Sequence, residues 1–299
     1  MQGIREMVRA CAQGDRERLT CTATVTKVSR ISRHFIRIQL TSPGFDRYTP
    51  APADAFRLLL PQHARASPTG EEGIPARVSM RAFTVHSFDR RSRTLEFDVL
   101  DHAHGLVANW LGSIVIGSAV EFIGIRREFA LDPSTTGLVV IADACALPAA
   151  SAVLGASAEI PYVHALLEVP HSEDFRLVPE SVSTHWLVCE NSSAGLGSSL
   201  EQLVLEQPPF PPGTQFWLAA ESGVVQRIRR YLLNDCEIPL SSLHAYAYWK
   251  YSVTADERDA RDLAAYTAAS ESGADVLDPE VVDRIEFGRS LLPEDTNTR

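Results

Sequence analysis

The sequence predicts an N-terminal antiparallel six-stranded β-barrel, then a parallel α/β domain and a helical C-terminal tail. Between residues 19 and 124, short segments alternate apolar or β-branched residues with polar ones, and turn signals separate them. After residue 137, nearly continuous apolar runs alternate with helical patterns, which is typical of a parallel sheet covered on both faces. We place the barrel at residues 18–132, the α/β domain at 137–252 and the tail at 253–299.

The barrel strands follow one another with turns and one short helix between them. The expected strands are residues 20–26, 34–40, 55–60, 81–88, 94–100 and 117–124. Pro61 ends the third strand, and the Pro-, Gly- and Ser-containing residues 62–76 predict a long loop. A polar turn joins the fourth and fifth strands as a hairpin, and residues 105–111 predict the helix. About six such strands are typical of a closed antiparallel barrel.

The α/β domain is expected to bind its ligand where its strands end. Its apolar strands are residues 138–143, 162–169, 185–189, 215–220 and 243–248, and its helices are residues 147–158, 198–205 and 224–233. Ligands of such sheets lie beyond the carboxyl ends of the strands. Those ends are residues 143–145, 190–192, 221–223 and 249–250. Residues 254–269 predict an Ala-rich helix, and residues 288–299 a frayed end.

Charge and cysteine content exclude several classes of protein. The chain has 299 residues and a net charge of −10, which does not favour nucleic acid or an anionic membrane as a partner. Five scattered cysteines without a Cys-x-x-Cys pair favour a reducing compartment. We find no secretory signal and no apolar run of membrane-spanning length. We therefore expect a cytoplasmic protein, whose oligomeric state the sequence does not predict.

Residues 81–86, Arg-Ala-Phe-Thr-Val-His, carry the clearest chemistry. The Arg81 guanidinium can bind a phosphate, the Phe83 ring can stack on a flat heterocycle, and the Thr84 hydroxyl can bond to a ring nitrogen. Together they suit a ligand that is part phosphate and part planar ring. The alternative is an ordinary alternating strand with a salt-bridged arginine.

A barrel followed by a parallel α/β domain, with Arg-x-Phe-Thr on a barrel strand, resembles the siderophore-interacting protein family. These are FAD-binding ferric-siderophore reductases related to ferredoxin reductases. The resemblance covers about residues 18–252. It implies non-covalent FAD in the barrel, NADPH or NADH at the strand ends of the second domain, and a ferric siderophore as the small-molecule substrate.

The resemblance also implies roles for individual residues. Arg81 would hold the FAD pyrophosphate, Phe83 would pack on the isoalloxazine, and Thr84 would touch its redox edge as the catalytic residue. His86 replaces the family's usual Arg. The implied cofactor-binding residues are Arg81, Phe83, Thr84, Val85, His86, Asp101, His102, His104, Gly105, Val107, Ala108, Asn109, Trp110, Asp143, Cys145, Ala146, Pro148, Glu221 and Trp249.

The substrate side is implied by two further segments. Residues 124–129 match the family's Gly-Pro-Arg-Gly-x-Phe in part, and residues 247–250 match its Gly-Tyr-Trp and a basic residue. The implied substrate-binding residues are Arg126, Arg127, Tyr248 and Lys250. The alternative for the two arginines is a solvated surface pair.

Several residues leave two interpretations open. Trp249 could stack near the cofactor or anchor the tail helix. Cys145 could be a reactive thiol at a helix start or a packing residue in place of the family's hydroxyl. The spacing of His102 and His104 permits metal binding, but no third ligand lies nearby in the sequence, and we expect no metal. Gly195-Leu196-Gly197 lacks the third glycine of a dinucleotide fingerprint and is expected to be a loop.

Departures from the family pattern keep a second function open. They fall at Leu106 and Ala108 in the pyrophosphate helix, at the Gly-Pro-Arg-Gly turn (residues 124–127), and at Ala144 and Cys145 in the nicotinamide loop. A member could keep FAD yet lose hydride transfer. Such a protein could catalyse a non-redox step of specialised metabolism, such as a cyclisation of a bulky substrate.

Overall fold

Six antiparallel strands close into the N-terminal barrel in the order β1-β2-β5-β4-β3-β6, as predicted. The computed structural model describes residues 19–61, 78–101, 105–190 and 199–276, together with 278, 281, 282, 284 and 285. The strands are β1 (Thr20–Arg30), β2 (Phe35–Thr41), β3 (Asp54–Pro61), β4 (Val78–Asp89), β5 (Thr94–Leu100) and β6 (Ala119–Arg127), with η1 (Pro43–Arg47) and α2 (Leu106–Ser113) between them. The loop expected at 62–76 and the frayed end expected at 288–299 lie outside the described residues.

The barrel interior is filled with aromatic rings. Phe56 stacks on Phe122 with their centroids 4.5 Å apart, and Phe97 meets Phe56 edge-on at 5.1 Å. These three side chains are almost completely buried. Because successive residues of a strand point to opposite faces, the inward residues build this core while their neighbours face outward. The alternation that predicted the strands therefore also built the core.

Five parallel strands form the sheet of the second domain, in the order β11-β10-β7-β8-β9. The strands are β7 (Gly137–Ala142), β8 (Tyr162–Val169), β9 (Ser183–Val188), β10 (Thr214–Glu221) and β11 (Leu243–Trp249). The strand order reverses between β7 and β10, and such a switch point is where ligands bind in open α/β sheets. The three central strands β8, β7 and β10 are almost entirely buried, in agreement with their continuous apolar sequence.

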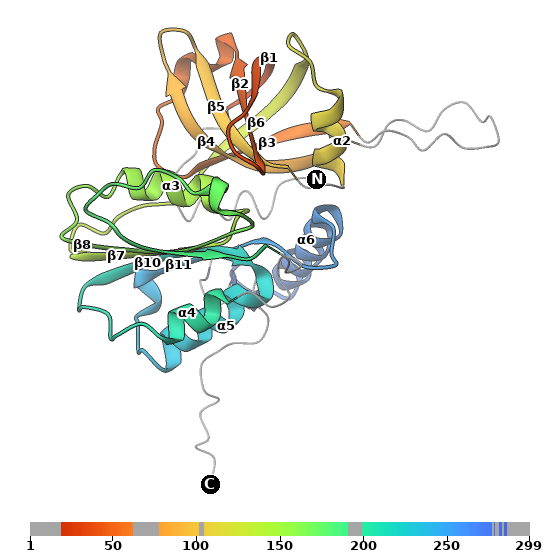
Figure 1. Cartoon of the computed structure of the whole chain (residues 1–299). Helices are drawn as coiled ribbons and strands as arrows, with labels where there is room; N and C mark the ends of the chain where they lie inside the picture. Colours follow the sequence, from red (N-terminus) through yellow and green to blue (C-terminus); the bar gives the residue numbers. More distant parts are fainter. Residues whose placement is uncertain are drawn as a thin grey trace.

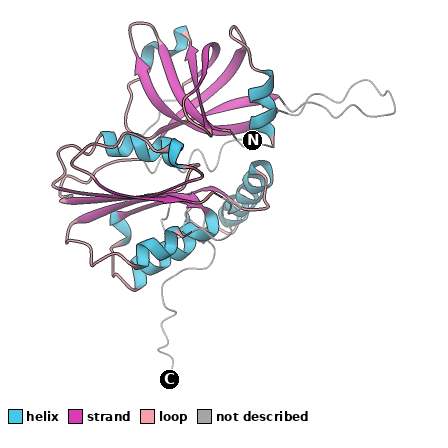
Figure 2. Cartoon of the chain, viewed as in Figure 1, coloured by secondary structure: helices cyan, strands magenta, loops and turns pink. Residues whose placement is uncertain are grey.

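Helices cover both faces of this sheet (Figures 1 and 2). α3 (Leu147–Gly155) lies on the face toward the barrel, and α4 (Leu200–Leu205) and α5 (Ser222–Asn234) lie on the other face. η2 (Ser172–Asp174) and η3 (Leu240–Ser242) are short turns, and α6 (Ala255–Glu271) is the predicted helix of the tail. α6 begins with a capping box between Thr254 and Glu257. No helix among the described residues is long and apolar enough to cross a membrane.

A buried aspartate of the α/β domain holds the barrel. Asp174 is fully buried and accepts hydrogen bonds from the His34 backbone N–H at 2.9 Å and the Ser32 hydroxyl at 2.8 Å. His34 Nδ1 also lies 2.6 Å from its second oxygen. Burial alone would raise the pKa of Asp174, but the bonds from His34 and Ser32 outweigh it and hold the pKa below its ordinary value. This contact fixes how the two domains sit against each other.

Replacing Asp174 by asparagine should loosen this contact, because an amide nitrogen would face donors that now bond to a carboxylate. We expect D174N to lower the free energy of unfolding by about 1–3 kcal/mol, measured by urea denaturation. Since the folded pKa lies below the unfolded one, the difference should persist down to about pH 4 and shrink below it. The control is D46N, at the exposed Asp46–Arg93 pair, where we expect about 0–1 kcal/mol. An equal loss in both variants would contradict the role of Asp174.

Candidate functional site

A cavity of about 220 Å³ lies between the barrel and the carboxyl edge of the parallel sheet. On the barrel side its wall includes Phe83 and Thr84 of β4 and Val107 of α2. On the sheet side it includes Tyr248 and Trp249 of β11, with Cys145 and Pro148 at the start of α3. The cavity therefore lies beside the switch point of the sheet and brings together segments far apart in sequence.

Strand β4 contributes only part of its motif to this cavity. Thr84 is 6% exposed, and Phe83 is half-buried with its ring 5.0 Å from Phe97. Val85 packs inside the barrel and His86 lies on its outer surface, so neither lines the cavity. The pairing with β5 shifts between Val85 and Ser87, so that His86 is the extra residue of a β-bulge. Val85 and His86 are thus separated from Phe83 and Thr84.

The other predicted flavin-side residues are more dispersed. Arg81 is half-buried, donates from Nη1 to the Met80 carbonyl at 2.8 Å, and does not line the cavity. Trp110 is buried in the barrel core beside Phe83, and Asp101 pairs with Arg30 at 2.5 Å. Ala108 is half-buried and Asn109 exposed, and neither lines the cavity. His102, His104 and the loop 195–197 lie outside the described residues.

The start of α2 offers backbone donors beside the cavity. Gly105 is the N-cap residue with φ +107°, a conformation that favours glycine, and no side chain caps the helix. Among the described residues, a Cβ at this position would meet no atom within 4 Å. The first N–H groups of a helix bind anions such as phosphate. This helix start, whose second residue Val107 lines the cavity, fits a phosphate-bearing ligand.

The two adjacent arginines of β6 point in different directions. The sequence predicted that the last barrel strand would end at residue 124, but β6 continues to Arg127 and pairs with β3. Neighbouring residues of a strand face opposite sides. Arg126 lines the cavity, whereas Arg127 pairs with the buried Asp54 at 3.2 Å and with the Thr49 carbonyl. The structure therefore brings Arg126, but not Arg127, to the site.

Glu128 is a site residue that sequence reasoning missed. It is 1% exposed and forms an ion pair with Arg126, while the Tyr248 hydroxyl donates to its other oxygen at 2.5 Å. Trp217 Nε1 donates to its backbone carbonyl at 3.2 Å. Glu128 thus bonds to both domains at the cavity wall. It stands at the variable position of the family motif, so the motif gave no signal for it.

The tail helix supplies a second missed residue. Arg258 of α6 lines the cavity and donates to the carbonyls of Ala247 and Tyr248 at 3.1 and 2.7 Å. Lys250, the predicted basic residue of this segment, is exposed and does not line the cavity. The capping sequence Thr-x-x-Glu at 254–257 predicts a helix start there, but only tertiary contacts bring Arg258 back to β11.

Asp143 joins the strand ends at the switch point. Its carboxylate accepts hydrogen bonds from the backbone N–H groups of Cys145, Ala146 and Glu221 at 2.9, 3.2 and 2.8 Å. Trp249 Nε1 donates to it at 2.7 Å. Burial raises the pKa of Asp143 to about 6 although these bonds oppose the rise. Its oxygens are thus bonded within the protein, and it shapes the site instead of presenting a free carboxylate.

The same contacts bear on the two interpretations left open for Trp249 and Cys145. Trp249 is anchored by its indole N–H and still lines the cavity with its ring. Burial raises the pKa of the Cys145 thiol well above its ordinary value, which favours the packing interpretation over the reactive thiol. Ala146 and Pro148 are buried at the start of α3. Glu221 caps α5 through Gly223 and Val224 and accepts from the Tyr251 N–H.

Comparison with known proteins gives matches along both domains. The model of siderophore-interacting FAD-binding domains matches residues 24–128, and that of siderophore-interacting proteins matches residues 135–252. The siderophore-interacting protein of Acinetobacter baumannii has a similar structure, with a TM-score of 0.73, 20% identity, and coverage of 86% of this chain and 100% of that one.

Two curated relatives are similar in sequence. The mycobactin import ATP-binding/permease protein IrtA of Mycolicibacterium smegmatis is 24% identical over 76% of this chain and 25% of its own length. Ferric vibriobactin reductase ViuB of Vibrio cholerae is 28% identical over 57% of this chain and 64% of its own length. The chain thus spans about a quarter of the first relative and less than two thirds of the second.

The Asp143–Trp249 bond should be visible in a pH titration. Because the folded pKa is about 6, above the ordinary value of about 3.9, Asp143 holds a proton in the folded state until the pH rises through about 6. The contribution of this proton to the free energy of unfolding is fully present below about pH 4 and is lost as the pH rises past about 6. We expect a fluorescence change of Trp249 with a midpoint near pH 6.

Both D143N and W249F should abolish this fluorescence transition, and D46N, at an exposed carboxylate, should leave it in place. A transition of unchanged size in D143N would contradict the assignment.

Proposed function

Because the chain belongs to the siderophore-interacting protein family, we propose that it uses NAD(P)H and bound FAD to reduce a ferric siderophore and release iron. The observation that carries this proposal is the interdomain cavity, where Phe83 and Thr84 of the barrel lie across from Tyr248 and Trp249 at the switch point. An electron carrier bound there would touch the barrel and lie next to the carboxyl edge of the parallel sheet, where the nicotinamide coenzyme is expected to bind.

The residues present fit FAD. Phe83, Val107 and Trp249 give the cavity apolar walls suited to a flat ring, and the Thr84 hydroxyl is the polar group beside them. The uncapped start of α2 would take the phosphates, assisted by the Arg81 charge. When bound, FAD supplies a carrier that takes two electrons as hydride and can pass them on singly to Fe(III).

Charge at the cavity supports an anionic substrate. Arg57, Arg126 and Arg258 line it, and the acidic residues Asp98 and Glu128 offset these arginines only in part. A positive site attracts an anionic ferric complex and orients it toward the cavity. Reduction then weakens the hold of hard oxygen ligands on the iron, because the attraction falls with the charge of the ion.

The carboxyl edge of the parallel sheet, where the nicotinamide coenzyme is expected to bind, favours NADH over NADPH. Asp143, Glu168 and Glu221 lie at the ends of β7, β8 and β10 and are nearly buried. Residues 143–149, 168–175, 189–198 and 221–226, which follow β7, β8, β9 and β10, contain no Lys or Arg, whereas Arg176 and Arg227 come directly after two of these ranges and Lys250 follows the edge strand β11. His171 lies 3.7 and 3.6 Å from Glu173 and Glu190. Asp143 and Glu221 are bonded within the protein, but a ribose 2′-hydroxyl can bond to an exposed acidic residue at this edge such as Glu190, whereas the acidic edge would repel a 2′-phosphate.

Anaerobic stopped-flow absorbance tests the function and the choice of coenzyme together. We expect NADH to bleach the flavin at least about tenfold faster than NADPH at equal concentration, since repulsion of about 1.4 kcal/mol gives a factor of ten. Faster bleaching by NADPH would contradict the assignment of the edge. FAD-loaded protein that neither coenzyme bleaches would contradict the reductase and favour a non-redox member of the family.

Two substitutions separate cofactor binding from electron transfer. R81A should weaken FAD binding by about ten- to a hundredfold, because a charged hydrogen bond contributes about 1.5–3 kcal/mol. T84V keeps the side-chain shape and should retain FAD, but slow its reduction by NADH about tenfold or more because the hydroxyl no longer orients the ring. FAD affinity is measured by equilibrium titration and reduction by stopped flow.

The matched controls are R91A and T22V, which change exposed residues of the same types away from the cavity. If R81A binds FAD as tightly as R91A does, residues 81–86 form a strand that has no role in FAD binding.

A further inference from the structure

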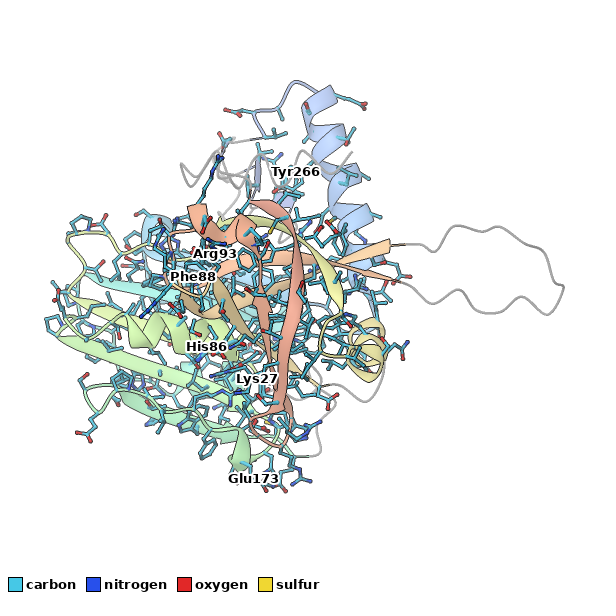
Figure 3. All side chains as sticks on the ribbon, turned by 90° about the horizontal axis from the view of Figure 1, so that it is seen from above. Lys27, His86, Phe88, Arg93, Glu173 and Tyr266 are labelled. Carbon is cyan, nitrogen blue, oxygen red and sulfur yellow. The ribbon has the colours of Figure 1, made fainter. Side chains whose placement is uncertain are left out.

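A second cleft, of about 740 Å³, lies at the other end of α3 from the flavin cavity. Its barrel wall includes Arg37, Asp98 and His86, on the outer surface of β2, β5 and β4. Its other wall includes Ser151 of α3 and the residues that follow η2, Phe175 to Leu177. His86, labelled in Figure 3, lies on β4 where the barrel meets the α/β domain. Asp98 lines both cavities, but the proposed function uses no other residue of this cleft.

Two arginines in the cleft share one buried carboxylate. Arg37 bonds to Asp98 through Nε at 2.7 Å and Nη2 at 3.0 Å. Arg176 Nη2 lies 3.6 Å from the same carboxylate, which is 2% exposed. The guanidinium of Arg176 also lies 4.4 Å above the Phe35 ring, and burial lowers its pKa. Asp98 can balance only one of the two positive charges.

Arg176 has donor groups that the described part of the chain does not satisfy. Its Nε and Nη2 are buried without a hydrogen-bond acceptor there, although the side chain as a whole is 14% exposed. Buried donors are normally bonded, so two guanidinium nitrogens without a hydrogen-bond acceptor at the wall of a cleft indicate that an acceptor can enter. A carboxylate matches the two parallel N–H groups of a guanidinium.

The other groups around the cleft limit the charge of the ligand. His86 has its pKa lowered by desolvation and by the charge of Arg37, so it adds little positive charge at neutral pH. Glu96, the next outward residue of β5, accepts from Gln39 and Ser87 and does not line the cleft. The net charge of Arg37, Arg176 and Asp98 is therefore +1, which a monoanion balances and a dianionic phosphate exceeds.

The rim of the cleft is apolar and exposed. Leu177 is 102% and Phe175 42% exposed, and Phe175 is held by stacking on Trp186 at 4.6 Å. Pro50, Pro52 and Phe88 line the opposite side. Apolar side chains on both sides of the cleft suit a flat apolar body between them.

We propose that this cleft binds a small monocarboxylate with a flat aromatic body, whose carboxylate bonds to Arg176 and whose ring lies between the rim residues. The bound molecule would contact Arg37 of the barrel and Arg176 of the α/β domain at once. It would therefore bridge the two domains without entering the flavin cavity.

Titration calorimetry of the full chain with saturating FAD tests this site, because FAD then occupies its own cavity. The probe is 2-naphthoate, and 2-naphthamide and inorganic phosphate are its neutral and dianionic counterparts. We expect saturable one-to-one binding of 2-naphthoate and at least tenfold weaker binding of the other two. No saturable binding of 2-naphthoate, or equal binding of 2-naphthamide, would overturn the proposal.

Two variants locate the binding. R176M keeps the apolar stem but removes the guanidinium, and L177D adds a repelling charge at a fully exposed position that cannot disturb the core. Each should weaken 2-naphthoate at least tenfold with FAD content unchanged, and R93M, at the exposed Asp46–Arg93 pair, should have no effect. If R176M fails to fold, the affinity of L177D for 2-naphthoate tests whether the ligand binds in this cleft. Wild-type affinity in L177D would place the ligand elsewhere and overturn the proposal.

Discussion

The site depends on the buried carboxylate of Asp143. A carboxylate can accept about four hydrogen bonds, and Asp143 accepts four, from the backbone N–H groups of Cys145, Ala146 and Glu221 and from the Trp249 indole. These groups come from the start of α3, the end of β10 and the end of β11. One side chain therefore fixes the geometry of the switch point, and Trp249 can serve as both an anchor and a cavity wall.

The interface between the domains combines an apolar cluster, in which Phe35 and Ala53 of the barrel pack with residues of β7 and α3, with a few polar contacts between residues far apart in sequence. Glu128 joins Arg126 of the barrel to Tyr248 of the sheet, and Asp174 of the α/β domain holds His34 of the barrel. Buried carboxylates with several donors favour one geometry, because shifting the domains would leave charges unpaired. The flavin cavity and the cleft beside Arg176 both lie along this interface, so their shapes depend on these contacts.

Much of the fold could be predicted, because alternation and apolar runs directly reflect which faces are buried. The barrel, the parallel sheet and the tail helix follow from those patterns and are confirmed. Local irregularities could not be predicted. The bulge at His86 turns half of its motif away from the cavity, and pairing with β3 extends β6 past Gly124, so that Arg126 and Arg127 diverge. Glu128 and Arg258 reach the site only through tertiary contacts.

The most direct test of the account is a crystal structure of the protein with FAD bound. We predict that the isoalloxazine ring lies in the interdomain cavity, with Phe83 and Thr84 on one side and Tyr248 and Trp249 on the other. A ring bound outside this cavity, for example in the cleft beside His86 and Arg176, would contradict the account.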